Sequence, residues 1–540
     1  MPTIEINLKD LEKLLGKKLP RDTDKLNEVL QYAKAEVEST QNDAVSLNIE
    51  DSNRPDLWCV EGVARELKGA LGIEKGLKKY QAKKSNFKVS VDKRLKNIRP
   101  FIACSILKGV KISDDIIIQL MQQQDKIDGT YGRKRRKTSI GLYNFDLLKF
   151  PLKYTVTKPN ENAFVPLEFT RKLTPRQILS QHPKGRDYVH LIEDLKEYPI
   201  YLDAKKQVLS MPPIINSNDL GKIKPETKNI IIEVTGTDYD VVQDVLRIMT
   251  LSLADRGGTI YSVSIDYPYR KKDVTPKFET RKIKLDKKRV NEVLGINFSE
   301  KEIAKLLEKA RYNVKGNMVE VPSYRVDIMD QVDLIEDVAI MYGYDKFKPL
   351  KLEVPTDGRL DKLTDFSDKI RELMIGFEAQ EIMTFSLVSE DILTSKMNLK
   401  DKPVKVLNPI SSNYTALRNS LIPSVLDFLS KNTTKRFPQK IFEVGQVIDK
   451  KESTRLVFCA SHNVADFTEV RQILEALLRN IGLKCKIEDF EHESFTPGRV
   501  GNIIINKKEV GIIGEISHKV RENFGLEKRV VCFEIDLSEL

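Results

Sequence analysis

The sequence alternates short β-branched runs with helical spacings over its whole length, and it contains neither an internal repeat of fixed period nor a low-complexity tract. A chain of 540 residues built this way needs several cores, because single hydrophobic cores stop growing at about 250–300 residues. The pattern predicts an α+β multidomain protein with three to four unlike domains of roughly 150 residues each. Changes in composition place these domains at residues 1–85, 95–270, 275–350 and 355–540.

Local periodicity predicts the main elements of these domains. Alternating apolar residues predict strands, and apolar residues three and four apart predict amphipathic helices. The expected strands cover residues 3–8, 44–49, 318–321 and 530–537, and the expected helices cover residues 241–254, 299–310 and 331–342. The polar, lysine-rich stretch over residues 75–96 predicts a linker.

Composition excludes several classes of protein. Five cysteines lie far apart without a CxxC pair, which argues against a disulfide framework and a cysteine zinc site, and for a reducing compartment. The N-terminus is amphipathic and carries acids, unlike a signal peptide, and the longest apolar runs are far short of a bilayer span. We therefore expect a cytoplasmic protein with no membrane partner.

The charge balance favours a polyanionic partner. The 90 basic and 79 acidic residues give a net charge of +11, which indicates basic faces on a folded protein. Five adjacent cations, Arg133, Lys134, Arg135, Arg136 and Lys137, form the densest basic run. Contact with RNA phosphates and a solvated loop explain this run equally well.

Three further segments carry polar groups beside rigid turns: residues 182–186, 210–216 and 233–237. Proline pairs form stiff pocket walls, and threonines beside a glycine expose hydroxyls and amides, although each segment alone is more often a turn. Arg54, in the sequence NRPD, either contacts a ligand or pairs with Asp56 or Glu61. The histidines show no metal-ligand spacing, and no hydrolase constellation is present.

An acidic motif follows residue 322. Asp333, Glu336 and Asp337 stand at i, i+3 and i+4 of an expected helix, so that three carboxylates crowd one face, with Asp327 on the segment before it. A hard cation such as Mg²⁺ would relieve the crowding. The alternative needs no metal, because Asp330 is a natural N-cap and acids in a first turn favour the helix dipole.

Taken together, these segments resemble the β subunits of phenylalanyl-tRNA synthetase in their archaeal and eukaryotic form. The resemblance covers essentially the whole chain. It is carried by residues 53–69, 182–188, 212–216, 234–237, 322–345, 407–426, 442–448 and 514–527. It implies an α2β2 tetramer acting on tRNA(Phe), whose α subunit holds the phenylalanine and ATP site, and a Mg²⁺ site at Asp327, Asp333, Glu336 and Asp337 shared with that subunit.

The resemblance also assigns the domains. It implies an N-terminal B1 domain, an α+β editing domain (B3/B4) that hydrolyses mischarged Tyr-tRNA, and a small winged-helix-like B5 domain. Residues 355–540 would form a B6/B7 domain with a class II synthetase-like antiparallel sheet but no catalytic residues, because the segment GIIGEIS (511–517) lacks the expected arginine. The expected editing pocket comprises Leu202, Ser210, Pro212, Glu233, Thr235 and Thr237.

Two rival interpretations remain: a non-catalytic nucleic-acid-binding protein and a freestanding deacylase. The resemblance over the full length disfavours both, because a deacylase has no need of residues 355–540.

Overall fold

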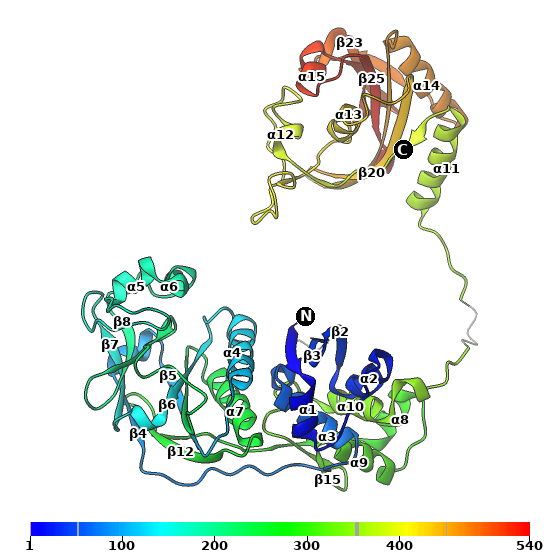
Figure 1. Ribbon diagram of the computed structural model, residues 1–540. Coiled ribbons are helices and arrows are strands. Elements are labelled where there is room, and N and C mark those ends of the chain that lie inside the picture. Colours follow the sequence, from blue (N-terminus) through cyan, green and yellow to red (C-terminus); the bar gives the residue numbers. More distant parts are fainter. Residues whose placement is uncertain (1, 51–52, 352–355, 450) are drawn as a thin grey trace. The chain divides into compact units, whose positions relative to one another are not determined.

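The computed structural model describes residues 2–50, 53–351, 356–449 and 451–540 (Figure 1). The chain divides into two compact units, Met1–Leu350 and Lys351–Leu540. The larger helices of the first unit are α1 (Leu8–Leu15), α2 (Thr23–Leu30), α3 (Val60–Ala70), α4 (Asp114–Gly129), α5 (Pro175–Gln181), α6 (Pro183–Tyr188), α7 (Tyr239–Asp255), α8 (Lys287–Leu294), α9 (Glu300–Lys309) and α10 (Gln331–Tyr342).

The strands of the first unit form three sheets. They are β1 (Thr3–Asn7), β2 (Ala35–Gln41), β3 (Ala44–Ile49), β4 (Lys88–Val91), β5 (Phe101–Lys108), β6 (Thr138–Asn144), β7 (Leu152–Thr157), β8 (Tyr198–Leu202), β9 (Val208–Met211), β10 (Ile215–Asn216), β11 (Asn229–Gly236), β12 (Thr259–Asp266), β13 (Asp273–Thr275), β14 (Arg281–Lys284), β15 (Asn313–Lys315) and β16 (Met318–Val321). The first sheet has the antiparallel order β1-β3-β2 and packs with α1 and α3.

The local sequence explains how α1 begins and ends. The side-chain oxygen of Asn7 accepts a hydrogen bond from the backbone N–H of Lys9, which satisfies a donor that the helix itself leaves free. Gly16 ends the helix at a φ of 73°, in the left-handed region that glycine adopts without a Cβ penalty. Leu11 and Leu15 are thereby fixed on the buried face.

The second sheet has ten strands and carries the site described below. Its order is β10-β9-β8-β7-β4-β12-β5-β11-β6, with β13 paired to β12. The sheet curls so far that its two ends meet: the Tyr143 hydroxyl on β6 lies 2.8 Å from the Ser210 Oγ on β9. The Asn216 side chain on β10 also reaches the Leu142 carbonyl on β6, at 3.4 Å. We call this meeting of β6 with β9 and β10 the seam.

Strand alternation separates two environments on β11. Ile230, Ile232 and Val234 face a cluster shared with α4 and α7, whereas Ile231 belongs to the core on the other face, inside the curl. Glu233 alternates with the first set and therefore points to the inner face, opposite Gly141 on β6 and Cys104 on β5.

The third sheet has the antiparallel order β14-β16-β15 and packs with α8, α9 and α10. Apolar residues of all three helices share this small core with Val319 and Val321. Ser299 caps α9 through a capping box with Glu302, which fixes the start of that helix.

The second unit is built on a seven-stranded sheet in the order β17-β20-β21-β25-β24-β23-β22, antiparallel except for the pair β17–β20. The seven strands are β17 (Gln380–Glu381), β20 (Gln439–Ile448), β21 (Glu452–His462), β22 (Lys486–Asp489), β23 (Phe495–Ile505), β24 (Lys508–Ile516) and β25 (Arg529–Asp536). A separate two-stranded sheet consists of β18 (Leu387–Val388) and β19 (Ala416–Leu417). The helices of this unit are α11 (Lys362–Gly376), α12 (Glu390–Leu393), α13 (Ile422–Ser430), α14 (Phe467–Asn480) and α15 (His518–Asn523).

The structure confirms the expected secondary elements, with boundaries shifted by two residues or fewer; at the end of β1, for example, residue 8 already belongs to α1. The linker prediction is wrong in part, because Lys88–Val91 forms β4, paired in parallel with both β12 and β7. Its Val89 is buried in the core, which a polar lysine-rich context conceals in the sequence. All five cysteines are free, as expected.

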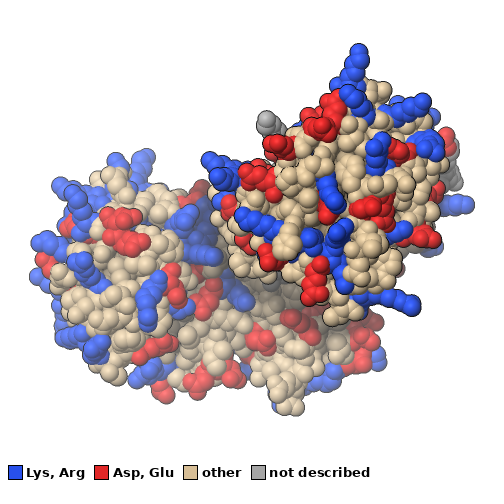
Figure 2. All heavy atoms as spheres, turned by 90° about the horizontal axis from the view of Figure 1, so that it is seen from above, with Lys and Arg blue, Asp and Glu red and all other residues tan. Residues whose placement is uncertain are grey.

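In the described ranges no helix combines the length and the apolar character that a bilayer crossing requires. On the face of the molecule shown in Figure 2, lysine and arginine side chains are interspersed with acidic ones. On this face the basic residues therefore form no patch free of acidic ones.

Candidate functional site: a cavity at the seam of the curled sheet

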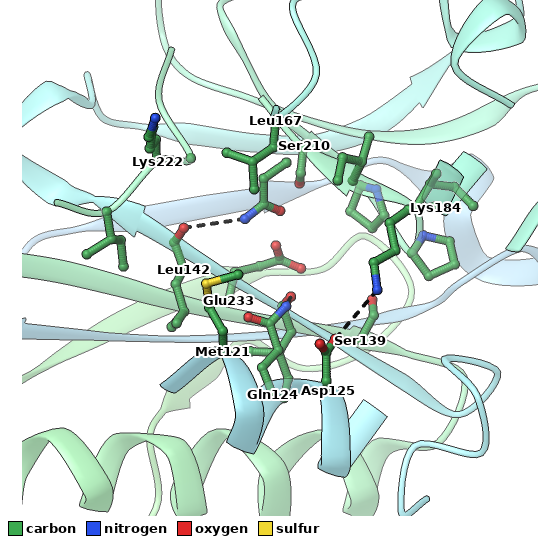
Figure 3. A pocket seen from close by; sticks show the side chains of 18 of the residues that line it. Met121, Gln124, Asp125, Ser139, Leu142, Leu167, Lys184, Ser210, Lys222 and Glu233 are labelled. Atoms are coloured by element: carbon green, nitrogen blue, oxygen red, sulfur yellow. Dashed lines mark hydrogen bonds and ion pairs between the residues drawn. The ribbon is translucent and has the colours of Figure 1, made fainter. Parts of the chain in front are cut away.

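A cavity of about 400 Å³ opens beside the seam, between α4 and the segment that joins β9 to β11. Most of the exposed surface of its wall is apolar, and polar side chains from several elements contribute the rest (Figure 3). The apolar lining includes Ile117, Leu120, Met121, Ile140, Leu142, Leu167, Pro212, Pro213, Ile214, Ile215 and Ile223. The polar lining includes Gln124, Asp125, Arg135, Ser139, Glu168, Lys184, Ser210, Asn216, Lys222 and Glu233.

Glu233 forms the centre of the polar part. The Tyr143 hydroxyl donates a hydrogen bond of 2.6 Å to the Glu233 Oε2, and the Ser210 Oγ lies 2.8 Å from the same hydroxyl. Ser210 and Glu233 both line the cavity, so this chain of groups crosses the seam and ends at an open space. No cation is paired with the Glu233 carboxyl among the described residues, although this side chain is buried.

The glycine at position 141 makes room for this arrangement. A Cβ there would lie 2.2 Å from the Tyr143 hydroxyl oxygen and 2.6 Å from the Glu233 Oε2. Contacts that short are excluded, so any side chain at this position would displace the polar groups of the cavity.

Burial raises the pKa of Glu233 to about 7, against opposing effects of the Tyr143 hydrogen bond and the more distant Arg99 guanidinium. Burial likewise raises the pKa of Tyr143 well above its usual value, and the neighbouring Glu233 adds to the shift. Near neutral pH the Glu233 carboxyl can therefore accept a hydrogen bond or, when protonated, donate one.

Arg99 supports the cavity from behind. Its guanidinium is buried and donates to Thr235 through Nε, at 3.0 Å to the hydroxyl, and through Nη2, at 2.8 Å to the carbonyl. It also donates to the carbonyl of Arg135, at 3.1 Å, and to the hydroxyl of Ser139. Arg99 thereby ties β11 and β6 to the basic loop that follows α4.

The basic run has two kinds of members. Arg135 is buried, donates to the carbonyls of Pro213 and Ile214 at 3.1 and 2.8 Å, and stacks on the ring of Tyr188. Lys137 pairs with Asp238 at 2.8 Å. The three others, Arg133, Lys134 and Arg136, are exposed.

The backbone of this loop is strained. Residues 133, 134 and 135 have φ values of 49°, 51° and 61°, a left-handed conformation that costs roughly 1–2 kcal/mol per non-glycine residue. The bonds from Arg99 and those made by Arg135 hold this conformation in place. The loop thus forms a fixed part of the cavity wall.

The structure brings together half of the residues expected in an editing pocket. Ser210, Pro212 and Glu233 line the cavity. Leu202 instead lies in the apolar core behind the wall, packed with Ile200 and Met211 among others.

The two threonines also lie outside the lining. Thr235 is fully buried and held by Arg99, whereas Thr237 is exposed and donates to the Arg136 carbonyl at 3.1 Å. Sequence reasoning missed Tyr143 and Gly141. The alternation of residues 139–144 predicts a strand, but nothing in it indicates a partner 67 residues away.

The four acidic residues expected to bind Mg²⁺ do not converge. Asp327 and Asp337 are buried and paired with Arg325, at 2.7 and 2.8 Å. Asp333 turns back to the start of its helix, and Glu336 lies on the surface beside Lys34, at 3.3 Å. The described residues contain no group of three potential ligands placed to hold a metal ion.

Electrostatics agrees with the arginine pairing. Burial alone would raise the pKa of Asp327, but the adjacent Arg325 guanidinium outweighs it and lowers the pKa to about 2. Arg54 pairs with Asp56, as one alternative held, and with Glu66 at 3.0 Å, whereas Glu61 contacts Arg256.

The second unit has a smaller cavity of about 220 Å³ beside its sheet, lined in part by Gln439 of β20 and Ser461 of β21. The buried Arg418 of this unit is bonded to Glu443 and Thr384, at 2.8 and 2.7 Å, and to the Gln446 carbonyl. The glycines of the GIIGEIS segment allow close strand packing: a Cβ at Gly511 would lie 2.0 Å from the Glu534 carbonyl oxygen, and one at Gly514 would lie 2.6 Å from the Phe495 ring.

Comparison with known proteins places this architecture. Two family models match the chain, the "Phenylalanyl tRNA synthetase beta chain CLM domain" over residues 351–537 and the "tRNA synthetase B5 domain" over residues 283–344. Together with the multidomain α+β fold, they define a subunit of an aminoacyl-tRNA synthetase.

Curated relatives give the particular family. The phenylalanine–tRNA ligase beta subunits of Pyrococcus horikoshii and Archaeoglobus fulgidus are 42% and 38% identical to this chain, over 100% of it and 100% and 98% of their own lengths. The crystal structure of an N-terminal fragment of the Pyrococcus horikoshii beta subunit covers 64% of this chain and 100% of its own, at 40% identity and a TM-score of 0.61. The chain belongs to the phenylalanine–tRNA ligase β-subunit family, which confirms the resemblance seen in the sequence.

Proposed function

We propose that this chain is the non-synthetic subunit of a phenylalanine–tRNA ligase and that its seam cavity hydrolyses tyrosine wrongly esterified to tRNA(Phe). One observation carries the proposal: an apolar cavity of about 400 Å³ ends in the buried, cation-free carboxyl of Glu233, bridged through Tyr143 to Ser210.

This arrangement suits a phenol and disfavours a phenyl ring. The apolar wall contributes to the binding of either ring, and the Glu233 carboxyl accepts a hydrogen bond from the tyrosine hydroxyl. A phenylalanine ring would leave the same carboxyl buried without that partner, and an unmet buried polar group costs roughly 1–3 kcal/mol. A site that hydrogen-bonds a hydroxyl therefore rejects the analogue that lacks it, whereas an apolar synthetic pocket rejects the extra hydroxyl only weakly.

The cavity wall supplies no histidine or cysteine among the described residues. We assign the hydrolytic water to a position held by hydroxyl groups and backbone amides at the cavity mouth, with assistance from the tRNA. Lys184 and Asp125 lie across one end of the cavity, 3.8 Å apart, where the ester and the terminal ribose would enter (Figure 3).

The synthetic reaction belongs to a partner in this proposal. Two observations support this: Arg418 is bonded within the chain to Glu443 and Thr384, and the glycines of β24 are packed against neighbouring strands. An α subunit would hold phenylalanine and ATP with its Mg²⁺, in a cytoplasmic α2β2 tetramer.

An exposed apolar surface in the second unit fits the pairing role. Met383 and Phe385 are 93% and 73% exposed, and Leu407 and Ile410 are fully exposed. The segment between α12 and α13, which contains them in part, is drawn in yellow in Figure 1 and projects away from the sheet. Large exposed apolar groups that gather in one region mark protein interfaces.

The remaining domains take supporting roles. Residues 1–85, 95–270, 275–350 and 355–540 would be the B1, B3/B4, winged-helix-like B5 and B6/B7 domains. The exposed cations Arg133, Lys134 and Arg136 lie on the loop that also forms the cavity wall, so we assign them to contact with the tRNA backbone near its acceptor end.

The test is hydrolysis of preformed Tyr-tRNA(Phe) by the complex of this chain with its α subunit. Glu233→Ala and Ser210→Ala should each lower the hydrolysis rate roughly 10- to 100-fold, as expected for the loss of a buried hydrogen-bond group. Phenylalanine-dependent ATP–pyrophosphate exchange should not change.

The exposed glutamate in Glu226→Gln serves as the matched control and should retain full hydrolysis. Full hydrolysis by both cavity variants would refute the assignment of the cavity. Pyrophosphate exchange by this chain alone would refute the division of labour between the subunits.

A further inference from the structure

Arg325 lies buried between two of the acidic residues that the sequence pattern assigned to Mg²⁺. Its Nε and Nη2 donate to the two Asp327 oxygens at 2.9 and 2.7 Å, and its Nη1 lies 2.8 Å from the Asp337 Oδ2. The Tyr312 hydroxyl donates a further, short hydrogen bond to Asp337. The side chains of Arg325, Asp327 and Asp337 are only 1%, 6% and 3% exposed.

A second arginine joins this group from the N-terminal part of the chain. Arg54 contacts both oxygens of Asp56 at 2.9 Å and one oxygen of Glu66 at 3.0 Å, and its Nε lies 3.9 Å from Asp327. Two guanidinium groups thus face four carboxyl groups. Burial raises the pKa of Glu66, against the opposing effect of Arg54 and Arg325.

The backbone comes unusually close at the same junction. A Cβ at Gly69 on α3 would lie 1.9 Å from the carbonyl oxygen of Lys309 at the end of α9. One turn earlier on α3, the Arg65 guanidinium stacks over the Tyr324 ring at 4.6 Å. Helix α3 therefore packs against both the end of α9 and the segment at residues 322–327.

The ten-stranded-sheet domain meets the same segment. Arg247 on α7 donates to the Ser323 carbonyl at 2.7 Å and to the Lys277 carbonyl at 2.9 Å. The segment that carries Arg325 and Asp327 thus contacts the N-terminal domain, helix α7 and the domain that runs from β14 to α10 (residues 281–342), which we call the β14–α10 domain.

The other two acids of the motif point elsewhere. The Asp333 Oδ2 accepts hydrogen bonds from the backbone N–H groups of Met329 and Asp330 at 2.6 and 2.9 Å. The Glu336 side chain is 53% exposed and pairs with Lys34. Mg²⁺ requires near-octahedral oxygens at about 2.0–2.1 Å, and the four acids do not fit such a shell.

We propose that Asp327 and Asp337 are the anionic half of an arginine clamp, in which Arg54 and Arg325 occupy the place that the sequence pattern assigns to a metal ion. The clamp holds the N-terminal domain against the β14–α10 domain and so fixes the first unit as one body. Its integrity depends on the guanidinium groups and is independent of divalent cations.

The first test measures metal binding to the complex of this chain with its α subunit, without ATP. After treatment with EDTA, the protein is titrated with Mn²⁺ and bound Mn²⁺ is counted by electron paramagnetic resonance. Wild type and Asp327→Asn should bind equal amounts, and restoring Mg²⁺ should not shift the Tm of the wild type. Loss of one bound Mn²⁺ per β chain in Asp327→Asn would overturn the proposal.

The second test uses thermal unfolding of matched variants. Arg325→Met and Asp337→Asn should each lower the Tm by about 5–10 °C, because the first leaves two buried carboxylates without their guanidinium and the second removes one of the two carboxylates that face Arg325. The Tm decrease of the double mutant should be well below the sum of the two single decreases, since both changes remove the same interaction. Glu336→Gln should leave the Tm within about 1 °C of wild type, as surface changes do.

A metal site predicts a different order of effects. There Glu336→Gln would be as damaging as Asp337→Asn, and Arg325→Met would be mild; that result refutes the clamp. If Arg325→Met does not fold, Tyr312→Phe removes only the hydroxyl bonded to Asp337 and should still lower the Tm. Tyr342→Phe, whose hydroxyl bonds no residue in the described ranges, is its control and should leave the Tm unchanged.

Discussion

Two buried glutamates in this chain, Glu443 and Glu233, have opposite kinds of partners for their carboxyl groups. In the second unit, Glu443 is locked: Arg418 approaches one carboxylate oxygen at 2.8 Å, and the Thr384 hydroxyl donates to the other at 2.7 Å. In the ten-stranded sheet, Glu233 has a tyrosine hydroxyl as its close partner and a cavity in front of it. Both side chains are 2% exposed, so burial alone does not distinguish them.

The difference lies in which partner satisfies the charge. A carboxylate bonded to an arginine within the same chain has its charge balanced there, and removing either partner of such a buried pair is destabilising. A carboxyl that is buried without a cation keeps a raised pKa and an open acceptor, which is the usual condition of groups that act on a ligand. Glu443 thus has the environment of a structural residue, and Glu233 has the environment that our proposed function requires.

The largest effect is expected where the charge is locked. Glu443→Ala leaves the Arg418 guanidinium buried without its carboxylate, and breaking a buried pair in this way costs about 3–5 kcal/mol of unfolding free energy. Urea unfolding followed by circular dichroism measures the loss. Glu452→Ala, an exposed glutamate on the neighbouring strand β21, should cost less than about 0.5 kcal/mol.

A cost below 1 kcal/mol for Glu443→Ala would remove the contrast, because it would show that Arg418 reaches solvent or another acceptor.

Glu233→Gln should raise the free energy of unfolding, whereas Glu443→Ala lowers it, and the gain should depend on pH. Between the ordinary glutamate pKa of 4.5 and the raised value of about 7, the folded state binds more protons than the unfolded state, so the stability of the wild type falls as the pH rises through this window. At 1.36 kcal/mol per pKa unit the deficit reaches about 3 kcal/mol above pH 7.

The variant cannot ionise at this position. Its free energy of unfolding should therefore rise relative to that of the wild type by this amount between pH 5 and pH 8, and urea unfolding at each pH measures the difference. The buried Asp128, whose pKa burial also raises to about 7, titrates in both proteins and cancels in the difference. Parallel stability curves for the two proteins would contradict an uncompensated Glu233.

Gly141→Ala tests the space in front of Glu233. The added methyl group would overlap the Tyr143 hydroxyl and displace the polar end of the cavity, and a misplacement of about 1 Å can cost 100-fold in rate. We expect a loss of this size in Tyr-tRNA(Phe) hydrolysis, with pyrophosphate exchange unchanged. Gly129→Ala, where a Cβ would meet no atom within 4 Å, is the matched control and should hydrolyse at the wild-type rate.

The smallest effect is expected at Thr237. Its hydroxyl is exposed and bonded to the Arg136 carbonyl, outside the cavity lining, so Thr237→Ala should change Tyr-tRNA(Phe) hydrolysis less than about twofold. Thr235→Ser, at the buried position behind the cavity wall, keeps the hydroxyl that accepts from Arg99 and provides the comparison for the hydrolysis rate. A strong loss in Thr237→Ala would extend the site beyond the seam.

Local pattern was sufficient to predict much of the fold. The helix expected at residues 331–342 and the strand at 318–321 have the observed boundaries, because their periodicity and caps are encoded within a few neighbouring residues. The strand β4 was missed because its two buried valines stand in a polar stretch, and only pairing with β12 and β7 makes it a strand.

The site was less predictable because it depends on contacts between distant strands. Ser210 and Glu233 were found through motif resemblance, but Tyr143 joins them only when the curl brings β6 to β9. Leu202 and Thr235 were wrongly expected in the pocket for the same reason: the sequence does not tell which side of a strand faces a cavity and which faces a core.

The acidic helix shows a third kind of limit. Spacing correctly placed Asp333, Glu336 and Asp337 within one helical turn, yet each found a different partner: a backbone N–H, a lysine and an arginine. Spacing fixes directions along a helix, whereas the partner depends on what the rest of the fold brings to that face.

The seam has a consequence for quality control in the cell. A crevice formed by the first and last members of a strand order exists only after every strand between them has taken its place. A copy of the protein in which one of these strands frays would lose the cavity of the proposed editing site, while the sheet of the second unit would persist. Under the proposed function, local damage to the first unit would then reduce error correction before it reduced charging.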